Sequence, residues 1–231
     1  MTRQVFGVGL LLGLVGAALP AGAGQPDKDG WVKLFDGRSL AGWVQRGGKA
    51  KYQAENGMLV GTAVPNTPNS FLCTEKEYAD FVLELEFNVD PNLNSGVQVR
   101  SHYAPEGKTV ESAGVKIKGI PGGRVFGYQV EIDPTPRAFT GGVYDEGRRK
   151  WLQDLSKNEK AREAFVPNRW NALRIECRGK AIKTWVNNVA AASVTDDVDP
   201  KGFIALQVHG IGKKTEALKV RWRNIRLKEL K

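Results

Sequence analysis

Apolar and polar residues alternate with a period of two along most of the chain after residue 24. The clearest run spans Asp80 to Val89, where Phe81, Leu83, Leu85 and Phe87 are separated by mostly polar residues. This period places alternate side chains on opposite faces of a β-strand. The same reasoning predicts strands at Val32–Phe35, Tyr52–Glu55, Met58–Thr62, Phe71–Thr74, Asp80–Val89, Gly96–Ser101, Val115–Lys118, Tyr128–Asp133, Trp170–Cys177, Ile182–Asn187, Phe203–His209 and Leu218–Leu230.

Turn residues separate these strands. Asn56-Gly57 predicts a two-residue type I′ hairpin. In the last strand, the alternation of apolar and polar residues shifts by one position at Arg223-Asn224, which predicts a β-bulge. A long loop is predicted from His102 to Gly123, around one short strand, and Ser156–Phe165 is the one segment with a helical pattern.

Roughly a dozen strands at short spacing, with no alternation of strands and helices, predict an all-β sandwich or barrel of antiparallel sheets with one short helix. Residues 24–231 are expected to form a single domain, because this length suits one core and contains no internal repeat or low-complexity segment.

The first 23 residues differ in composition from the rest. An early Arg3 precedes an apolar run from Val5 to Leu19, and small residues follow at Ala21 and Ala23. This pattern predicts a secretory signal peptide over residues 1–23 and a periplasmic or secreted protein. A transmembrane anchor is the alternative, but Gly and Ala dilute the run and no basic cluster follows it, so no membrane span is expected after cleavage.

The charge distribution bears on possible partners, and the cysteine positions bear on disulfide formation. The formal net charge is +9, but Lys and Arg are scattered and form no basic block, so nucleic acid is not an expected partner. Cys73 and Cys177 are the two cysteines. An exported chain could join them in a disulfide, but both occupy apolar strand positions, which favours buried free thiols.

One strand carries an unusual polar face. Tyr128, Val130 and Ile132 alternate with Gln129, Glu131 and Asp133 before Pro134 ends the ladder. An amide and two carboxylates in succession are uncommon on a solvent-facing strand. The segment that follows is predicted to be a loop, and it collects paired charges, aromatic residues and glycines: Gly141, Gly142, Tyr144, Asp145, Arg148, Arg149 and Trp151.

Three other strands also carry two polar residues on the face opposite their apolar residues. These pairs are Glu84 and Glu86, Gln98 and Arg100, and Gln207 and His209. If these strands neighbour one another, one sheet face presents carboxylates, amides, a guanidinium and an imidazole. Such a face suits a sugar, whose hydroxyls need dense, directional donors and acceptors. Tyr103, Tyr144 and Trp151 would supply apolar surface for a sugar ring. The alternative is an outer face of cross-strand ion pairs, each worth little.

Common catalytic signatures are missing. The chain has no Gly-x-Ser-x-Gly elbow, phosphate-binding loop or His-Glu-x-x-His motif, and two histidines exclude a multi-histidine metal site. A divalent cation held by the oxygens of Glu131, Asp133 and Asp145 is possible on composition. His209 follows a strand and precedes Gly210, where its ring could face a site.

The order and spacing of many short motifs resemble those of the DUF1080 family, described as 3-keto-disaccharide hydrolases or 3-keto-glucoside lyase/hydratases. The matching segments are Trp31-Val-Lys-Leu-Phe-Asp-Gly-Arg-Ser-Leu-Ala-Gly-Trp43, Glu55-Asn-Gly-Met-Leu-Val-Gly61, Tyr78-Ala-Asp-Phe81, Asn94-Ser-Gly96, Gly127-Tyr128, Gly141-Gly-Val-Tyr144, Trp170-Asn171, Trp185-Val-Asn187, Gln207-Val-His-Gly210 and Trp222-Arg-Asn-Ile225. Many members carry Glu-x-Gln where this chain has Gln129-Val-Glu131, and an Asn-Gly turn where it has Asn187-Asn188.

The resemblance implies a concanavalin A-like jelly roll, export, and cleavage of 3-keto-glucosides by elimination and hydration on a small carbohydrate substrate. Such chemistry needs a base, a cation beside the enolate and an acid. Glu131, Arg100 and His209 are the expected catalytic set, and Gln98, Gln129, Tyr144, Asp145, Arg148, Gln207 and Trp151 are the expected substrate-binding residues. Two alternatives stay open: a glycoside hydrolase with paired carboxylates drawn from Glu84, Glu86 or Glu131, and a non-catalytic carbohydrate-binding module.

Overall fold

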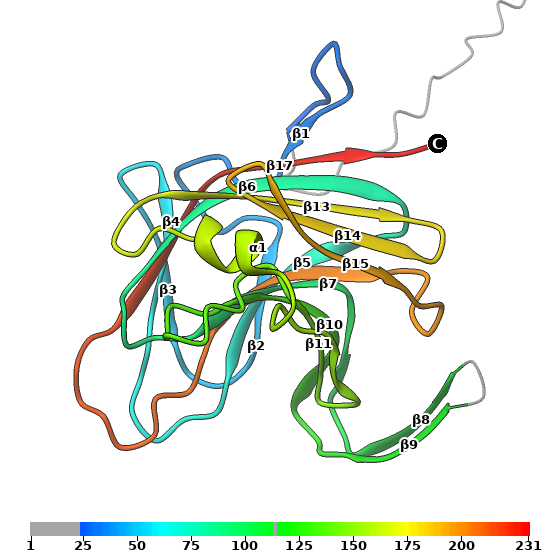
Figure 1. The fold of residues 1–231 in the computed structure, drawn as a ribbon. Coiled ribbons are helices and arrows are strands. Elements are labelled where there is room, and N and C mark those ends of the chain that lie inside the picture. Colours follow the sequence, from blue (N-terminus) through cyan, green and yellow to red (C-terminus); the bar gives the residue numbers. More distant parts are fainter. Residues whose placement is uncertain (1–23, 113–114) are drawn as a thin grey trace, which may run out of the picture.

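The computed structural model describes residues 24–112 and 115–231 and consists of two antiparallel sheets packed face to face (Figure 1). The first sheet has eight strands: β1 (Val32–Lys33), β3 (Lys51–Glu55), β4 (Met58–Thr62), β6 (Phe81–Val89), β13 (Asn171–Arg178), β14 (Ala181–Val186), β15 (Val189–Thr195) and β17 (Lys219–Glu229). Their order is β15-β14-β13-β6-β17-β4-β3, with β1 paired to the far end of β17.

The second sheet has seven strands: β2 (Trp43–Gly47), β5 (Ser70–Tyr78), β7 (Ser95–Ala104), β10 (Arg124–Ile132), β11 (Val143–Glu146), β12 (Lys150–Gln153) and β16 (Gly202–Val208). Their order is β12-β11-β10-β7-β16-β5-β2. A separate hairpin of β8 (Lys108–Ser112) and β9 (Val115–Ile120) extends away from the sandwich beside β10 and β11 (Figure 1).

The core lies between the two sheets. The apolar set of β6, Phe81 to Phe87, is buried on the inner face of the eight-stranded sheet, and Tyr128, Val130 and Ile132 of β10 are buried on the inner face of the other. Interdigitated inner faces of this kind are the basis of a β-sandwich. The predicted all-β jelly-roll sandwich is therefore confirmed.

Local signals in the sequence also match the structure. Asn56 and Gly57 have φ angles of 50° and 77°, as a type I′ turn requires, and they join β3 to β4. Asn187-Asn188 has φ angles of 47° and 67° and joins β14 to β15 in the same way, so the hairpin forms without glycine. The register of β17 against β6 shifts between Arg223 and Arg226, which confirms the predicted bulge.

The helix α1 (Glu159–Ala164) is shorter than the predicted segment. Asn158 caps it by accepting a hydrogen bond from the Ala161 backbone N–H at 3.2 Å. Just beyond the helix, the ring of Phe165 stacks on Phe87 with 6.1 Å between centroids, which holds the segment against the core.

Two predicted loops contain more regular structure than expected. Residues 102–123 hold both strands of the β8–β9 hairpin, and the loop predicted after Pro134 contains the β11–β12 pair. Within β11–β12, Tyr144 pairs with Trp151 across the ladder. The pattern concealed these strands because they are short and many of their residues are charged or polar.

The signal-peptide prediction falls on residues 1–23, which lie outside the described residues. Among residues 24–112 and 115–231, no helix is long and apolar enough to cross a membrane. Cys73 in β5 and Cys177 in β13 are buried free thiols in different sheets, as predicted.

Candidate functional site

The polar face predicted for β10 lies on the outer side of the seven-stranded sheet. In the ladder, Glu131 pairs with Gly96 of β7, which in turn pairs with Gln207 of β16. One row along, Gln129 pairs with Gln98. Four of the predicted residues therefore converge on three adjacent strands, although β10 and β16 are far apart in sequence.

Three of them, Gln129, Glu131 and Gln207, form one wall of a cavity of about 640 Å³, a size suited to a small ligand, whereas Gln98, predicted to bind substrate, does not line it. Of the predicted site residues, Gln129, Glu131, Tyr144, Trp151, Gln207 and His209 line it. Pattern reasoning missed the other lining residues, which are Asn69, Asn94, Arg124, Thr135, Arg137 and Glu146, and it considered Asp133 only as a metal ligand.

Glu131 is 5% exposed and its carboxylate accepts two amide hydrogen bonds. Asn94 Nδ2 donates to Oε1 at 2.7 Å, and Gln129 Nε2 donates to Oε2 at 2.8 Å. Burial raises the pKa of Glu131 above its ordinary value, while the two amide donors and the charge of Arg137 oppose part of that rise. The group is thus a desolvated carboxylate held in one orientation, as a general base requires.

The orientation of the amides beneath Glu131 follows from the carboxylate. An ionised carboxylate only accepts, so Gln129 must turn its NH₂ toward Glu131 and its Oε1 away. Gln98 Nε2 and Gln207 Nε2 then donate to that Oε1 at 2.7 and 2.8 Å. Ser101 Oγ donates to Gln98 Oε1 at 2.6 Å, whereas the buried Gln207 Oε1 has no partner within the described residues.

Gln98 therefore supports Gln129 from behind and is itself fully buried. A side chain at position 96 would disturb this arrangement, because a Cβ on Gly96 would lie 2.6–2.9 Å from the Gln129 side chain. Glycine is needed here to let the Gln129 amide lie across β7.

Arg137 is the cation beside Glu131. Its Nη2 lies 3.5 Å from Glu131 Oε1, and its Nε donates to Asp133 Oδ2 at 2.7 Å. The guanidinium carbon lies 5.2 Å from the ring centroid of Phe139 and 5.3 Å from that of Trp151. Burial raises the pKa of Asp133, but hydrogen bonds from Thr135 and Arg137 outweigh it and hold that pKa below its ordinary value.

Aromatic rings form the side of the cavity next to β11 and β12. Tyr144 lies opposite Gln129 in the ladder and meets Trp151 edge-on, with 5.2 Å between centroids. Trp151 also meets Phe139 edge-on at 5.3 Å. These contacts fix ring surfaces beside the polar wall, where the apolar face of a sugar ring can pack.

His209 lies just after β16 and is exposed at the mouth of the cavity. Its Nδ1 is 2.8 Å from the carbonyl oxygen of Gly210. Because a carbonyl only accepts, Nδ1 carries a hydrogen, and Nε2 has no hydrogen-bond partner among the described residues.

The prediction that Arg100 faces this site is wrong. A bulge in the β7–β10 pair, with Arg100 at φ 47° and Gly127 at φ 127°, reverses the alternation after Gln98. Arg100 is 1% exposed and donates to the carbonyls of Ala79 and Gly179, each at 2.7 Å, and to Asp80 at 2.8 Å. It closes one end of the sandwich, and Arg137 supplies the cation near Glu131 instead.

Asp145 and Arg148 are also absent from the cavity. Asp145 pairs with Tyr128 in the ladder and so faces the opposite side of β11 from Tyr144. It accepts hydrogen bonds from Arg148 and Arg149, which continue to Asp199 and Asp196. This buried charge network ties the turn after β11 to the segment before β16, so its role is structural.

The same geometry separates the three carboxylates considered as metal ligands. Asp145 lies on the other side of β11 from Glu131, and Asp133 is bonded to Arg137 and Thr135. The described residues contain no group of three or more His, Cys, Asp or Glu side chains arranged to hold a metal ion. The side chains present do not fit the divalent cation considered from composition.

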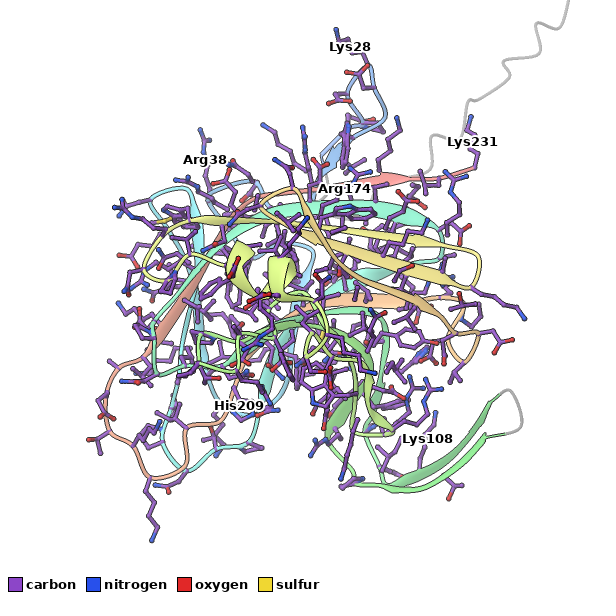
Figure 2. The ribbon with its side chains drawn as sticks, in the orientation of Figure 1. Lys28, Arg38, Lys108, Arg174, His209 and Lys231 are labelled. Carbon is purple, nitrogen blue, oxygen red and sulfur yellow. The ribbon has the colours of Figure 1, made fainter. Side chains whose placement is uncertain are left out.

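Glu84 and Glu86 lie on the other sheet, contrary to the prediction that they share a face with Glu131. Glu84 accepts from Arg174 and Arg226, and Glu86 accepts from Arg223 and Asn224, at 2.6–2.9 Å. Figure 2 shows Arg174 on the outer side of the eight-stranded sheet and His209 on the opposite side of the molecule. A second, open cavity of about 610 Å³ lies over this ion-paired face.

Comparisons with solved structures agree with the architecture. A carbohydrate-binding module, CBM66 from Bacillus subtilis, is 14% identical, with a TM-score of 0.56 over 81% of this chain and 96% of that one. A Parabacteroides distasonis protein provisionally named a glycosyl hydrolase is 18% identical, with a TM-score of 0.54 over 88% and 95%. A Bacillus subtilis protein with a galectin-like fold and no known function is 11% identical, with a TM-score of 0.53 over 81% and 89%.

At these identities the likeness shows the fold, which is a jelly-roll sandwich shared with sugar-binding proteins. The chain has no match among curated proteins. The 3-keto-alpha-glucoside-1,2-lyase-like domain family, however, matches residues 30–228, which span both sheets and every residue of the cavity. The match covers most of the sequence, and the chain therefore belongs to this family.

Proposed function

We propose that this protein cleaves the glycosidic bond of 3-keto-glucosides by elimination followed by hydration, in the cavity on the outer face of the seven-stranded sheet. The observation that carries the proposal is the state of Glu131. It is a buried carboxylate with a raised pKa, held by two amide donors beside a cation. Membership of the family supports the same reaction.

The ketone at C3 determines what the protein has to do. It makes the C2 hydrogen acidic, so a carboxylate base can remove it and leave an enolate. Collapse of the enolate expels the oxygen substituent from C1, and water then adds to the resulting enone. Glu131 is the base in this scheme, and Arg137, next to it, stabilises the negative charge of the enolate.

Hydrolysis by the usual pair of carboxylates has less support. That mechanism needs a second carboxyl group facing the first across the bond. Glu84 and Glu86 belong to the other sheet, and Asp133 is occupied by Arg137, Thr135 and the Phe139 N–H. Glu146, the other carboxylate lining the cavity, is paired with Arg124 at 2.7 Å.

Incubation of the purified protein with a methyl 3-keto-glucoside and with methyl glucoside tests the proposal. We expect release of methanol and 3-keto-glucose from the first and no release from the second. Turnover of the parent glucoside at a similar rate would assign the protein to ordinary glycoside hydrolases.

A carbohydrate-binding module is the second candidate function, because the fold is shared with CBM66 and the cavity offers amides beside aromatic rings. Saturable binding of the keto sugar without any turnover, at substrate concentrations well above the dissociation constant, would favour this function.

We also propose that the protein works outside the cytoplasm, on the strength of the N-terminal sequence. Expression of the full chain in a bacterium should yield mature protein beginning at Gly24. N-terminal sequencing of the periplasmic and cytoplasmic fractions checks this, and uncleaved protein in the cytoplasm alone would contradict it.

A further inference from the structure

The hydroxyl group of Tyr144 is unused in the cavity. Tyr144 lines the site, and its oxygen makes no hydrogen bond with any of the described residues. Two other phenols of the chain are engaged: Tyr52 donates to the carbonyls of Ser70 and Leu206, and Tyr128 donates to Asp196. Tyr78 and Tyr103 do not line the cavity. An unpaired phenol beside a candidate base is available to a ligand.

The ring of Tyr144 is held in place while its hydroxyl is left free. It stands opposite Gln129, two residues along the strand from Glu131 and on the same face. Its edge contact with Trp151, at an interplanar angle of 74°, fixes the ring. Diagonal neighbours on adjacent strands lie about 7–8 Å apart, so one sugar ring lying on this face can meet both Glu131 and Tyr144.

The charges nearby keep the phenol protonated. Burial raises the pKa of Tyr144 above its ordinary value, and the carboxylates of Glu146 and Glu131 raise it further. A group that holds its proton at neutral pH can deliver it when an alkoxide forms beside it.

His209 is less suited to that task. Its Nδ1 contact is with the carbonyl of Gly210, and the ring is exposed at the mouth of the cavity, two strands away from β10 in the sheet. Of the groups that line the cavity, Tyr144 is the one that combines an unengaged hydroxyl hydrogen with a position on the Glu131 face.

We propose that Tyr144 is the catalytic acid that protonates the departing glycosidic oxygen. This inference rests on the proposed function. In the first half-reaction Glu131 takes the C2 proton, and the C–H electron pair forms the enolate. The enolate then expels the C1 oxygen as the C1–O bond breaks, and that oxygen takes the Tyr144 proton and leaves as an alcohol.

The second half-reaction restores both residues. The Tyr144 phenolate removes a proton from water as the water oxygen bonds to C1 of the enone. Glu131 returns its proton to C2 of the enolate so formed. The sum is one glycoside and one water converted to one alcohol and one 3-keto sugar, with no oxidant or reductant required.

The test compares leaving groups that need an acid with those that do not. Release of the leaving group is measured in a single turnover, so that the hydration step shared by all substrates does not enter the rate. Wild type and Tyr144→Phe are compared on a methyl 3-keto-glucoside, whose alkoxide must be protonated, and on a nitrophenyl 3-keto-glucoside, whose phenolate leaves unaided. Loss of an acid catalyst costs on the order of 100-fold or more. We expect that loss on the methyl substrate and a loss below about 10-fold on the nitrophenyl substrate.

Tyr103→Phe is the matched control, because Tyr103 lies on the same sheet but stacks under Arg46 and does not line the cavity. It should leave both rates unchanged. Equal losses on both substrates in Tyr144→Phe would overturn the inference, because a misfolded or merely mispositioned site does not distinguish leaving groups. A leaving-group-dependent loss in His209→Gln, with none in Tyr144→Phe, would also overturn it and assign the acid to His209.

Failure of the proposed function gives a different result. If wild type turns over neither keto substrate, the elimination mechanism itself falls. If wild type turns over both and Tyr144→Phe shows no dependence on the leaving group, only the assignment of the acid falls.

Discussion

Glu131 and Arg100 are both almost fully buried charged residues, yet the structure uses them in different ways. The carboxylate of Glu131 borders a cavity and accepts two amides from neighbouring positions. The guanidinium of Arg100 has its donors taken up by two backbone carbonyls and Asp80. A buried charge satisfied entirely by structural partners has no capacity left for a ligand, whereas Glu131 has lone pairs facing the cavity.

Replacement of Glu131 by Gln should reduce turnover of a 3-keto-glucoside on the order of 100-fold, because the amide cannot accept the C2 proton. Stability should change little. Removal of a desolvated charge stabilises the variant. The new NH₂ group at position 131 destabilises it, because that group faces the NH₂ of Asn94 or of Gln129, both of which donate to Glu131 in the wild type. Each effect is on the order of 1 kcal/mol. Thermal melts and single-turnover assays measure both. Full activity would exclude Glu131 as the base.

The raised pKa of Glu131 also predicts a pH profile. The base works only when ionised, so kcat/KM of the wild type should fall on acidification at a pH above 4.5, the ordinary glutamate value. The pH dependence of stability has the opposite sign to that of activity. A carboxyl group whose folded-state pKa is raised favours folding below its unfolded-state pKa, and this contribution is lost as the pH rises through the folded-state pKa. An acidic limb at or below pH 4.5 would contradict the assignment.

The two arginines separate function from stability. Arg137→Ala should lower turnover about 100-fold or more through loss of the charge beside the enolate. It should cost less unfolding free energy than Arg100→Ala, because the Arg137 side chain is 45% exposed and the buried Asp133 keeps its hydrogen bonds from Thr135 and the Phe139 N–H. Arg100→Ala should cost about 2–4 kcal/mol of unfolding free energy, because it empties the space of a side chain that is 1% exposed and removes its hydrogen bonds to Ala79, Gly179 and Asp80, and it should keep the activity of the folded fraction. Denaturant unfolding and active-site titration test the pair, and the opposite pattern would restore Arg100 to the site.

At the scale of elements, the middle strand β7 organises the site. It pairs with β10 on one side and β16 on the other, so it brings Glu131 and Gln207 to either side of Gly96. The bulge beyond Gln98 then turns Arg100 away from this face. The strand β7 thus brings Glu131 and Gln207 together at the cavity and keeps Arg100 out of it.

Gly96→Ala should therefore impair the site without abolishing the fold. The added Cβ would displace the Gln129 side chain, which lies 2.6–2.9 Å away, and so weaken the hydrogen bond from Gln129 to Glu131. We expect a loss of activity of about 10-fold, the equivalent of one hydrogen bond of roughly 1.4 kcal/mol. Gly107→Ala is the control, because its Cβ would meet only ordinary contacts at 3.6–3.8 Å. Activity equal to that of the control would show that Gln129 does not orient Glu131.

At the scale of the whole molecule, the two outer faces of the sandwich differ in how their charges are used. Over the eight-stranded sheet, Glu84 and Glu86 are each bonded to basic or amide side chains of neighbouring strands. Over the seven-stranded sheet, the polar side chains surround a cavity and Gln207 Oε1 has no partner within the described residues. The first face is a surface of cross-strand pairs, and the second has the unsatisfied groups of a binding site.

The sandwich also separates the two cysteines. Burial raises the pKa of Cys73 and of Cys177 to about 12, and the thiols belong to different sheets. Native protein should therefore react very slowly with an aromatic disulfide reagent at neutral pH, because the thiolate is the nucleophile. After unfolding in denaturant without reductant, two thiols per chain should react. If none reacts under denaturing conditions, the cysteines form a disulfide.

The sequence by itself determined the local parts of this protein. Alternation at Phe81–Phe87 identified a strand and its buried face, because a strand has a side-chain period of two whatever its neighbours are. Asn56-Gly57 and Asn187-Asn188 defined their hairpins through residues that tolerate positive φ. The same period placed Gln129 and Glu131 on one face of their strand, and this predicted the centre of the candidate site.

Only the tertiary structure decided which strands are neighbours and where the alternation breaks. Glu84 and Glu131 have the same polar parity but belong to different sheets, and the pattern within a strand carries no information about its partners. Asn94 and Arg137 reach Glu131 from loops with no periodic signal. Arg100 left the predicted face because of the bulge where β7 pairs with β10. Register and bulges depend on how the buried faces fit together, so the full set of residues around Glu131 is defined only in the packed sandwich.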